Sequence, residues 1–103
     1  MKNAKKCASN RTEILKLMGI HYWLIGKPKK AFTWWERSIK VGEKLGARPE
    51  LARTYMEVGK RLQKNEKGFK ELNGLTADDY LDKARILFEE MDLKWDLEEL
   101  EKM

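Results

Sequence analysis

The chain has 103 residues, of which 42% are apolar and 38% charged, with only two prolines and a net charge of +5. This length suits one folding unit with a continuous core and excludes a second independent domain, and the composition excludes disorder over most of the chain. The single cysteine, Cys7, excludes an intramolecular disulfide, and the lack of a long apolar run excludes a membrane-spanning helix. We therefore expect a cytoplasmic protein with a mild preference for acidic partners.

The chain opens with a segment that lacks apolar periodicity. Residues 1–9 are predicted to form a disordered tail, so the folded domain is expected over residues 10–103. Asn10 followed by Glu13 predicts a helix start, because the Asn oxygen can accept an orphan amide proton while the Glu reaches back. Pro28 predicts the start of the second helix. The inner stripe predicted for the first helix comprises Ile14, Leu17, Met18, Tyr22 and Ile25.

Two further helices and a loop follow. Gly46 predicts a left-handed cap at the end of the second helix, and Pro49 predicts the start of the third. The segment 65–74 holds charges and two glycines, which predicts a loop. The inner face predicted for the second helix comprises Ala31, Trp35, Ser38, Ile39 and Leu45. The stripe predicted for the third comprises Leu51, Tyr55, Val58, Gly59 and Leu62.

The last part of the chain predicts two more helices. Thr76 with Asp79 repeats the helix-start device of the first helix. A short terminal helix is expected over about residues 94–102. The inner stripe predicted for the fourth helix comprises Ala77, Tyr80, Leu81, Ala84, Leu87, Phe88 and Met91.

The second half of the sequence restates the first. Residues 36–51 align with residues 82–97 at a constant offset of 46, whereas Gly19 aligns with Gly59 at an offset of 40. The second unit therefore carries six extra residues (46 minus 40) in its internal loop. The two glycines favour a close approach of antiparallel helices, because they carry no side chain.

The repeated positions carry a family resemblance. They resemble the large, small and aromatic positions of the tetratricopeptide repeat: Leu15, Met18, Gly19, Tyr22, Ala31, Trp35 and Ser38 in the first unit, and Tyr55, Val58, Gly59, Leu62, Ala77, Leu81 and Ala84 in the second. The resemblance implies an all-α fold of two antiparallel helical hairpins, over about residues 11–46 and 49–92, followed by a C-terminal helix. The long spacing is similar to that of C-terminal tails of bacterial signalling proteins with cyclase, kinase or ATPase domains.

The resemblance implies a non-catalytic protein-interaction module. Family binding positions map onto Lys16, Ile20, Trp23, Arg53, Met56, Lys60 and Lys64. A basic groove around Trp23 would suit an extended acidic peptide with one apolar anchor, although these lysines also fit a simple solvated face. The alternative function is that of a regulatory C-terminal part of a larger signalling enzyme. Nucleic-acid binding is a third and less favoured alternative, because only residues 27–30 cluster lysines without acids.

Three tryptophans, Trp23, Trp34 and Trp95, fall on or near the edges of the predicted apolar stripes. Trp34 and Trp95 fit either a cover over neighbouring helices or a contact in a homodimer. A pair of repeats is fewer than the roughly three that a stable stack needs. A second copy is therefore an alternative partner.

The sequence offers little for catalysis. His21 is the only histidine, and Cys7 has no recognisable partner for a nucleophilic or metal role. Asp78 and Asp79 sit in a predicted first helical turn, where amide dipoles stabilise negative charge. We expect no catalytic residues, metal site, cofactor or small-molecule substrate.

Overall fold

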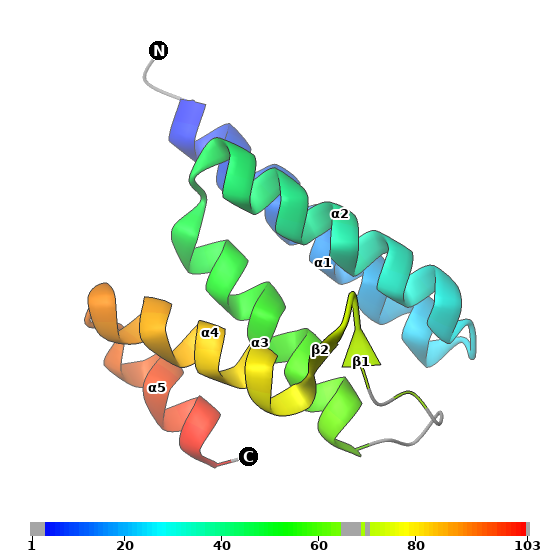
Figure 1. The fold of residues 1–103 in the computed structure, drawn as a ribbon. Helices are drawn as coiled ribbons and strands as arrows, with labels where there is room; N and C mark the ends of the chain where they lie inside the picture. The colour runs from blue at the N-terminus through cyan, green and yellow to red at the C-terminus, as the bar shows by residue number, and fades with distance from the viewer. Residues whose placement is uncertain (1–3, 65–68, 70, 103) are drawn as a thin grey trace.

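The computed structural model describes residues 4–64, 69 and 71–102, and of residues 4–9 the backbone alone. The described residues form an all-α fold with one small two-stranded sheet, so the predicted fold class is confirmed (Figure 1). In chain order the elements are α1 (Ala4–Leu24), α2 (Pro28–Leu45), α3 (Arg48–Lys64), β1 (Glu71–Leu72), β2 (Leu75–Thr76), α4 (Ala77–Glu90) and α5 (Lys94–Glu101).

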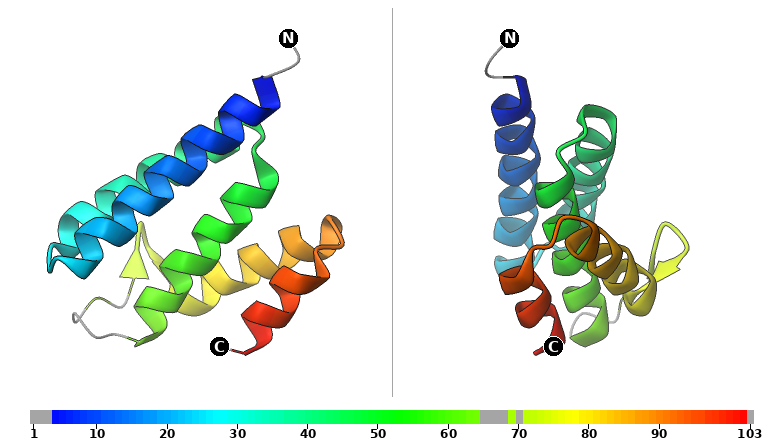
Figure 2. Two further views of the ribbon diagram at one scale, coloured as in Figure 1. Left: turned by 180° about the vertical axis from the view of Figure 1, so that it is seen from behind. Right: turned by 90° about the vertical axis from the view of Figure 1, so that its left-hand side faces the viewer.

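The helices pair as two antiparallel hairpins. α1 packs along α2, and α3 packs along α4. The views in Figure 2 show α3 between the α1–α2 hairpin and the α4–α5 pair. α5 folds back beside α3 and α4 at the end of the molecule opposite to α1 and α2.

α1 is longer than the sequence predicts. It begins at Ala4, so the predicted tail over residues 1–9 is wrong for residues 4–9, while residues 1–3 lie outside the described residues. Alanine and lysine are strong helix formers, and they extend the helix on the N-terminal side of Asn10. Asn10, which was predicted to start the helix, therefore lies inside α1.

Other helix ends follow the predicted chemistry. Gly46 caps α2 with φ of 71°, in the left-handed region, and Pro28 occupies the first turn of α2. Thr76 accepts a hydrogen bond from the Asp79 amide at 3.4 Å, and the Asp79 carboxylate accepts one from the Thr76 amide at 2.9 Å. This reciprocal pair is the capping box expected at the start of α4.

The inner stripe predicted for α1 is largely wrong. Ile14, Leu17 and Ile25 are each at least half exposed, at 58%, 51% and 50%. α1 instead buries Thr12 and Trp23 on its opposite side. Apolar residues occur on both sides of this helix, so their periodicity cannot select the side that packs. The predicted inner residue Leu45 of α2 is also exposed, in the last turn.

Glycines allow close helix packing, as predicted. A Cβ at Gly19 would overlap the indole of Trp35, and a Cβ at Gly59 would lie 2.7 Å from Cδ2 of Leu81. The Trp35 indole N–H crosses the interface and donates to the Lys16 carbonyl at 3.0 Å. Each hairpin is therefore held at a separation that a side chain at either glycine would disturb.

A small buried polar network joins the first three helices. The Ser38 hydroxyl of α2 donates to the Thr12 carbonyl of α1 at 2.8 Å and lies 2.9 Å from the Thr54 hydroxyl of α3. The Thr54 hydroxyl donates to the Glu50 carbonyl at 2.9 Å. These hydrogen bonds give the buried hydroxyls their partners; burial without a partner would destabilise the fold.

The loop predicted over residues 65–74 contains β1 and the turn of the small sheet, and β2 follows it; residues 65–68 and 70 lie outside the described residues. β1 and β2 pair antiparallel through a turn at Asn73 and Gly74, which both have positive φ, 56° and 76°. The Tyr80 hydroxyl of α4 donates to the Leu72 carbonyl at 2.8 Å. Burial raises the pKa of Tyr80 to about 12, so this hydroxyl keeps its proton at neutral pH.

Candidate partner-binding groove

One bidentate salt bridge, between Arg53 and Asp96, holds α5 against α3. The Arg53 guanidinium donates to both carboxylate oxygens of Asp96, at 3.1 and 3.2 Å, and to Glu50 at 3.3 Å. The hydrogen bond to Asp96 raises the pKa of Arg53 above its ordinary value. The Asp96 carboxylate is almost fully buried, so the Arg53 guanidinium supplies the hydrogen bonds that water would otherwise give it.

A groove lies beside this ion pair, between α3 and α5. Its volume is about 350 Å³, at the lower end of the range for ligand pockets, roughly 300 to 1,000 Å³. Trp95 is the most exposed of its large apolar side chains, at 68%. The lining residues are Met56, Glu57, Lys60, Trp95, Glu99 and Lys102.

The charges in the groove are unequally satisfied. Glu57 accepts a hydrogen bond from Arg61 at 2.6 Å, and Lys102 pairs with Glu99 at 3.4 Å. Lys60 makes no ion pair with a carboxylate in the described part of the chain. The groove therefore presents one cation without a counter-charge beside an apolar wall.

Trp23 does not line a groove, which corrects the prediction for this residue. Its side chain is 4% exposed and packs in the core against Phe32 and Trp35, with ring centroids 5.7 and 5.8 Å away. The Arg61 guanidinium lies over the Trp23 ring at 5.7 Å. The aromatic residues of α2 bury this side chain, and the periodicity along α1 alone does not reveal that contact.

The remaining predicted binding residues divide between two places. Met56 and Lys60 line the groove, whereas Arg53 forms the ion pair with Asp96 and does not line it. Ile20 is partly buried against the core, and Lys16 of α1 is half-buried. Lys64 is exposed in the last turn of α3 and does not line the groove.

The two tryptophans proposed as oligomer contacts lie apart. Trp95 joins Met56 and Lys60 in the groove. Trp34 stacks on Tyr22 on the first hairpin, with ring centroids 6.1 Å apart and planes 11° from parallel. The groove thus combines residues that the sequence had assigned to two different roles.

The sequence analysis missed three residues of the groove, Glu57, Glu99 and Lys102. Trp95, Glu99 and Lys102 are spaced by four and three residues along α5, which places them on one side of that helix. The same spacing relates Met56 and Lys60 of α3. This periodicity could have identified Glu99 and Lys102 once α5 was known to lie beside α3; Glu57 follows from its position next to Met56.

The residues considered for catalysis stand apart from the groove. His21 is exposed on α1 and contacts the Tyr22 ring edge-on. Asp78 and Asp79 lie in the first turn of α4, and the Cys7 side chain lies outside the described residues. The described residues contain no cluster of three His, Cys, Asp or Glu side chains that could hold a metal ion. Among them there is also no helix with the length and apolar character needed to cross a bilayer.

Comparison with known proteins leaves the groove to be interpreted from its own chemistry. The chain matches no family model, no curated protein and no solved structure.

Proposed function

We propose that this chain is a non-catalytic protein-interaction module of the tetratricopeptide type, and that the groove between α3 and α5 binds an extended peptide segment. The observation that carries the proposal is Trp95, 68% exposed beside Met56 and Lys60 in one groove. Exposed tryptophans within a concave surface are typical of binding hot spots, because they bury a large apolar area on binding.

The groove favours a particular kind of segment. Met56 and Trp95 suit one apolar side chain, since methionine adapts its shape to a ligand and the indole supplies a rigid wall. Lys60 suits a neighbouring carboxylate, because it has no intramolecular counter-charge among the described residues. We therefore expect an acidic peptide with one apolar anchor.

The rigid placement of α5 supports this role. The Arg53–Asp96 pair fixes α5 before a ligand arrives, so binding does not have to order the helix. A preformed groove is the arrangement expected of a binding surface on a helical scaffold.

The test is selection from a peptide display library against the immobilised wild-type chain, followed by measurement of the Kd of a selected peptide. We expect selected peptides to share an apolar residue next to Asp or Glu. Trp95→Ala and Lys60→Glu should each weaken binding by about tenfold or more.

The matched controls are Leu45→Ala, an exposed apolar residue away from the groove, and Lys94→Glu, an exposed lysine of α5 that does not line it. Both should bind as the wild type does. Selection without any enriched peptide, or equal affinities for wild type and Trp95→Ala, would refute the proposal.

A further inference from the structure

The first hairpin has a strong excess of positive charge. Residues 10–45 contain eight Lys and Arg residues against three acidic ones, a net charge of +5. Lys30, Arg37 and Lys44 are exposed and spaced by seven residues, so they lie along one stripe of α2. Within the described residues none of the three pairs with a carboxylate.

Two of these cations lie over half-buried aromatic rings. The Lys30 ammonium is 5.5 Å from the centre of the Tyr22 ring, and the Arg37 guanidinium is 5.0 Å from that of Trp34. Tyr22, Lys30, Thr33, Trp34 and Arg37 line a shallow depression of about 260 Å³ that contains no carboxylate. The rings restrict the cations without neutralising them, so the depression remains ready to accept an anion. We call this surface the basic end.

The last two helices have the opposite excess. Residues 77–101 contain ten acidic residues against three Lys and Arg, a net charge of −7. A depression of about 520 Å³ lies there between α3, α4 and α5, lined by Gln63, Asp78, Leu81, Asp82, Arg85, Leu100 and Glu101. We call this surface the acidic end.

Most of the acidic charge at this depression is uncompensated. Arg85 donates to Asp82 at 3.1 Å. Asp78 and Glu101 have no ion-pair partner among the described residues. The depression is therefore suited to a cationic side chain such as lysine or arginine.

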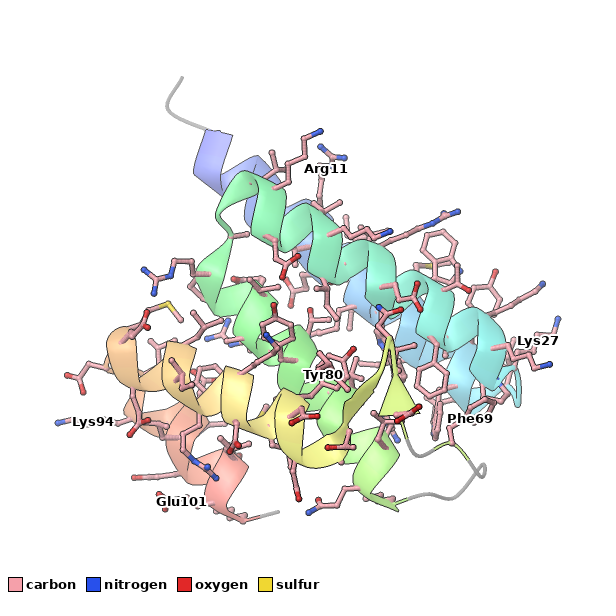
Figure 3. All side chains as sticks on the ribbon, viewed as in Figure 1. Arg11, Lys27, Phe69, Tyr80, Lys94 and Glu101 are labelled. Carbon is pink, nitrogen blue, oxygen red and sulfur yellow. The ribbon has the colours of Figure 1, made fainter. Side chains whose placement is uncertain are left out.

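The two charged surfaces cannot meet within one molecule. Figure 3 places the labelled Arg11 and Lys27 on the first hairpin and the labelled Glu101 on the opposite side of the molecule. α3 lies between the two regions (Figure 2). The charges of one end can be compensated only by solvent ions or by another molecule.

We propose that the basic end of one copy docks on the acidic end of the next, so that copies associate head to tail. The two surfaces are complementary in sign, and both are features of the same chain. A contact between two different surfaces leaves one copy of each surface free in a dimer, so the association extends beyond a dimer, into a ring or an open chain. This inference deepens the proposed function, because it names a second copy as a partner of the interaction module, but it uses surfaces separate from the groove.

The first experiment measures the mass of the wild-type chain by sedimentation or light scattering over a range of protein and salt concentrations. At low salt we expect the weight-average mass to rise with concentration to at least twice the monomer mass of 12.2 kDa. At 1 M salt, where charges are screened within about 3 Å, it should return to the monomer.

The second experiment uses two charge-reversed variants. Lys30→Glu with Arg37→Glu makes the basic end acidic, and Asp82→Lys with Glu101→Lys makes the acidic end basic. Each variant alone should remain monomeric at low salt, because its two ends then repel. Circular dichroism checks that both variants fold. Lys30→Glu places a negative charge in the first turn of α2, and Glu101→Lys places a positive charge in the last turn of α5; the helix dipole favours both.

Mixing the two variants is the decisive measurement. The unchanged acidic end of the first variant meets the unchanged basic end of the second, so a complex should form again. Both variants keep a net positive charge, because the wild-type value of +5 changes to +1 and +9. Non-specific attraction therefore cannot produce the recovery.

Three results would overturn the inference. They are a wild-type chain that stays monomeric at low salt, variants that associate as well as the wild type, and a mixture that forms no complex. A monomeric chain that instead shifts an oligonucleotide through Lys30 and Arg37 would assign the basic end to nucleic acid. Peptide binding in the groove would survive all of these results, so failure here is distinct from failure of the proposed function.

Discussion

Gly46 and Asp92 lie in the turns that follow α2 and α4, at the offset of 46 that relates the two halves of the sequence. Both have positive φ, 71° and 54°. The following amides also bond alike, from Ala47 to the Gly42 carbonyl at 3.0 Å and from Leu93 to the Phe88 carbonyl at 2.9 Å. The same turn is therefore built once with glycine and once with aspartate.

This difference predicts a stabilising substitution. Asp92→Gly removes a Cβ from a left-handed conformation and an acidic charge from a helix C-terminus, and both changes favour the folded state. We expect a gain of about 0.5 to 1 kcal/mol, which raises the midpoint of thermal unfolding by about 2 to 8 °C. Circular dichroism at 222 nm measures the midpoint.

The matched substitution is Gly46→Asp, which should lower the midpoint by a similar amount. Opposite shifts at the two positions would show that backbone conformation governs them. A lower midpoint for Asp92→Gly would mean that the Asp92 side chain stabilises the turn, contrary to this prediction.

At the scale of elements, α5 depends on one buried carboxylate. Asp96→Asn keeps the size of the side chain but removes the charge that Arg53 and the fold surround. We expect a loss of about 1 to 2 kcal/mol, less than for a fully buried pair, because Arg53 is partly exposed and can be rehydrated. Amide hydrogen exchange in α5 should become at least about tenfold faster, with little change in α1 and α2.

The control for α5 is Lys102→Gln, which removes an ion pair that lies at the surface. It should leave exchange in α5 unchanged. Equal exchange rates in wild type and Asp96→Asn would show that α5 is held by its apolar contacts alone.

The sequence predicted the helices better than the segment between α3 and α4. The caps at Gly46 and Thr76 are local chemistry, so they were predictable. The pair Asn73 and Gly74 is the strongest short hairpin signal in a sequence, yet the charges around it favoured a plain loop. Its strands are only two residues long, which is too short for an alternation pattern.

For the groove, the sequence identified several of the residues but not their proximity. Met56, Lys60 and Trp95 were all identified from the sequence, but as parts of different surfaces. Their proximity depends on α5 folding back beside α3, which the Arg53–Asp96 pair directs over a separation of 43 residues. The prediction for Trp23 was wrong for a similar reason, since packing against Phe32 and Trp35 of α2 buries its side chain, and the periodicity along α1 does not reveal that contact.

At the scale of the whole molecule, two hairpins form one core because further contacts join them. α3 packs against both α1 and α2, and the Thr12, Ser38 and Thr54 network crosses that junction. Phe69, in the insertion of the second hairpin, contacts Phe32 of the first with ring centroids 5.0 Å apart. The segment between α3 and α4 and the helix α5 thus add packing to the core that the two hairpins share.

These contacts predict cooperative unfolding with Phe69 as one of its links. Trp23, Trp34 and Trp35 lie in the first hairpin, so fluorescence reports mainly on that half, whereas circular dichroism reports on every helix. The two transitions should coincide in the wild type. Phe69→Ala should lower the free energy of unfolding by about 1 to 3 kcal/mol, less than for a fully buried phenylalanine because Phe69 is half-buried. Phe69→Leu, which keeps an apolar side chain, should lose less than half as much. Separate transitions in the wild type would mean that the hairpins unfold independently, and the junction through α3 would then be too weak to couple them.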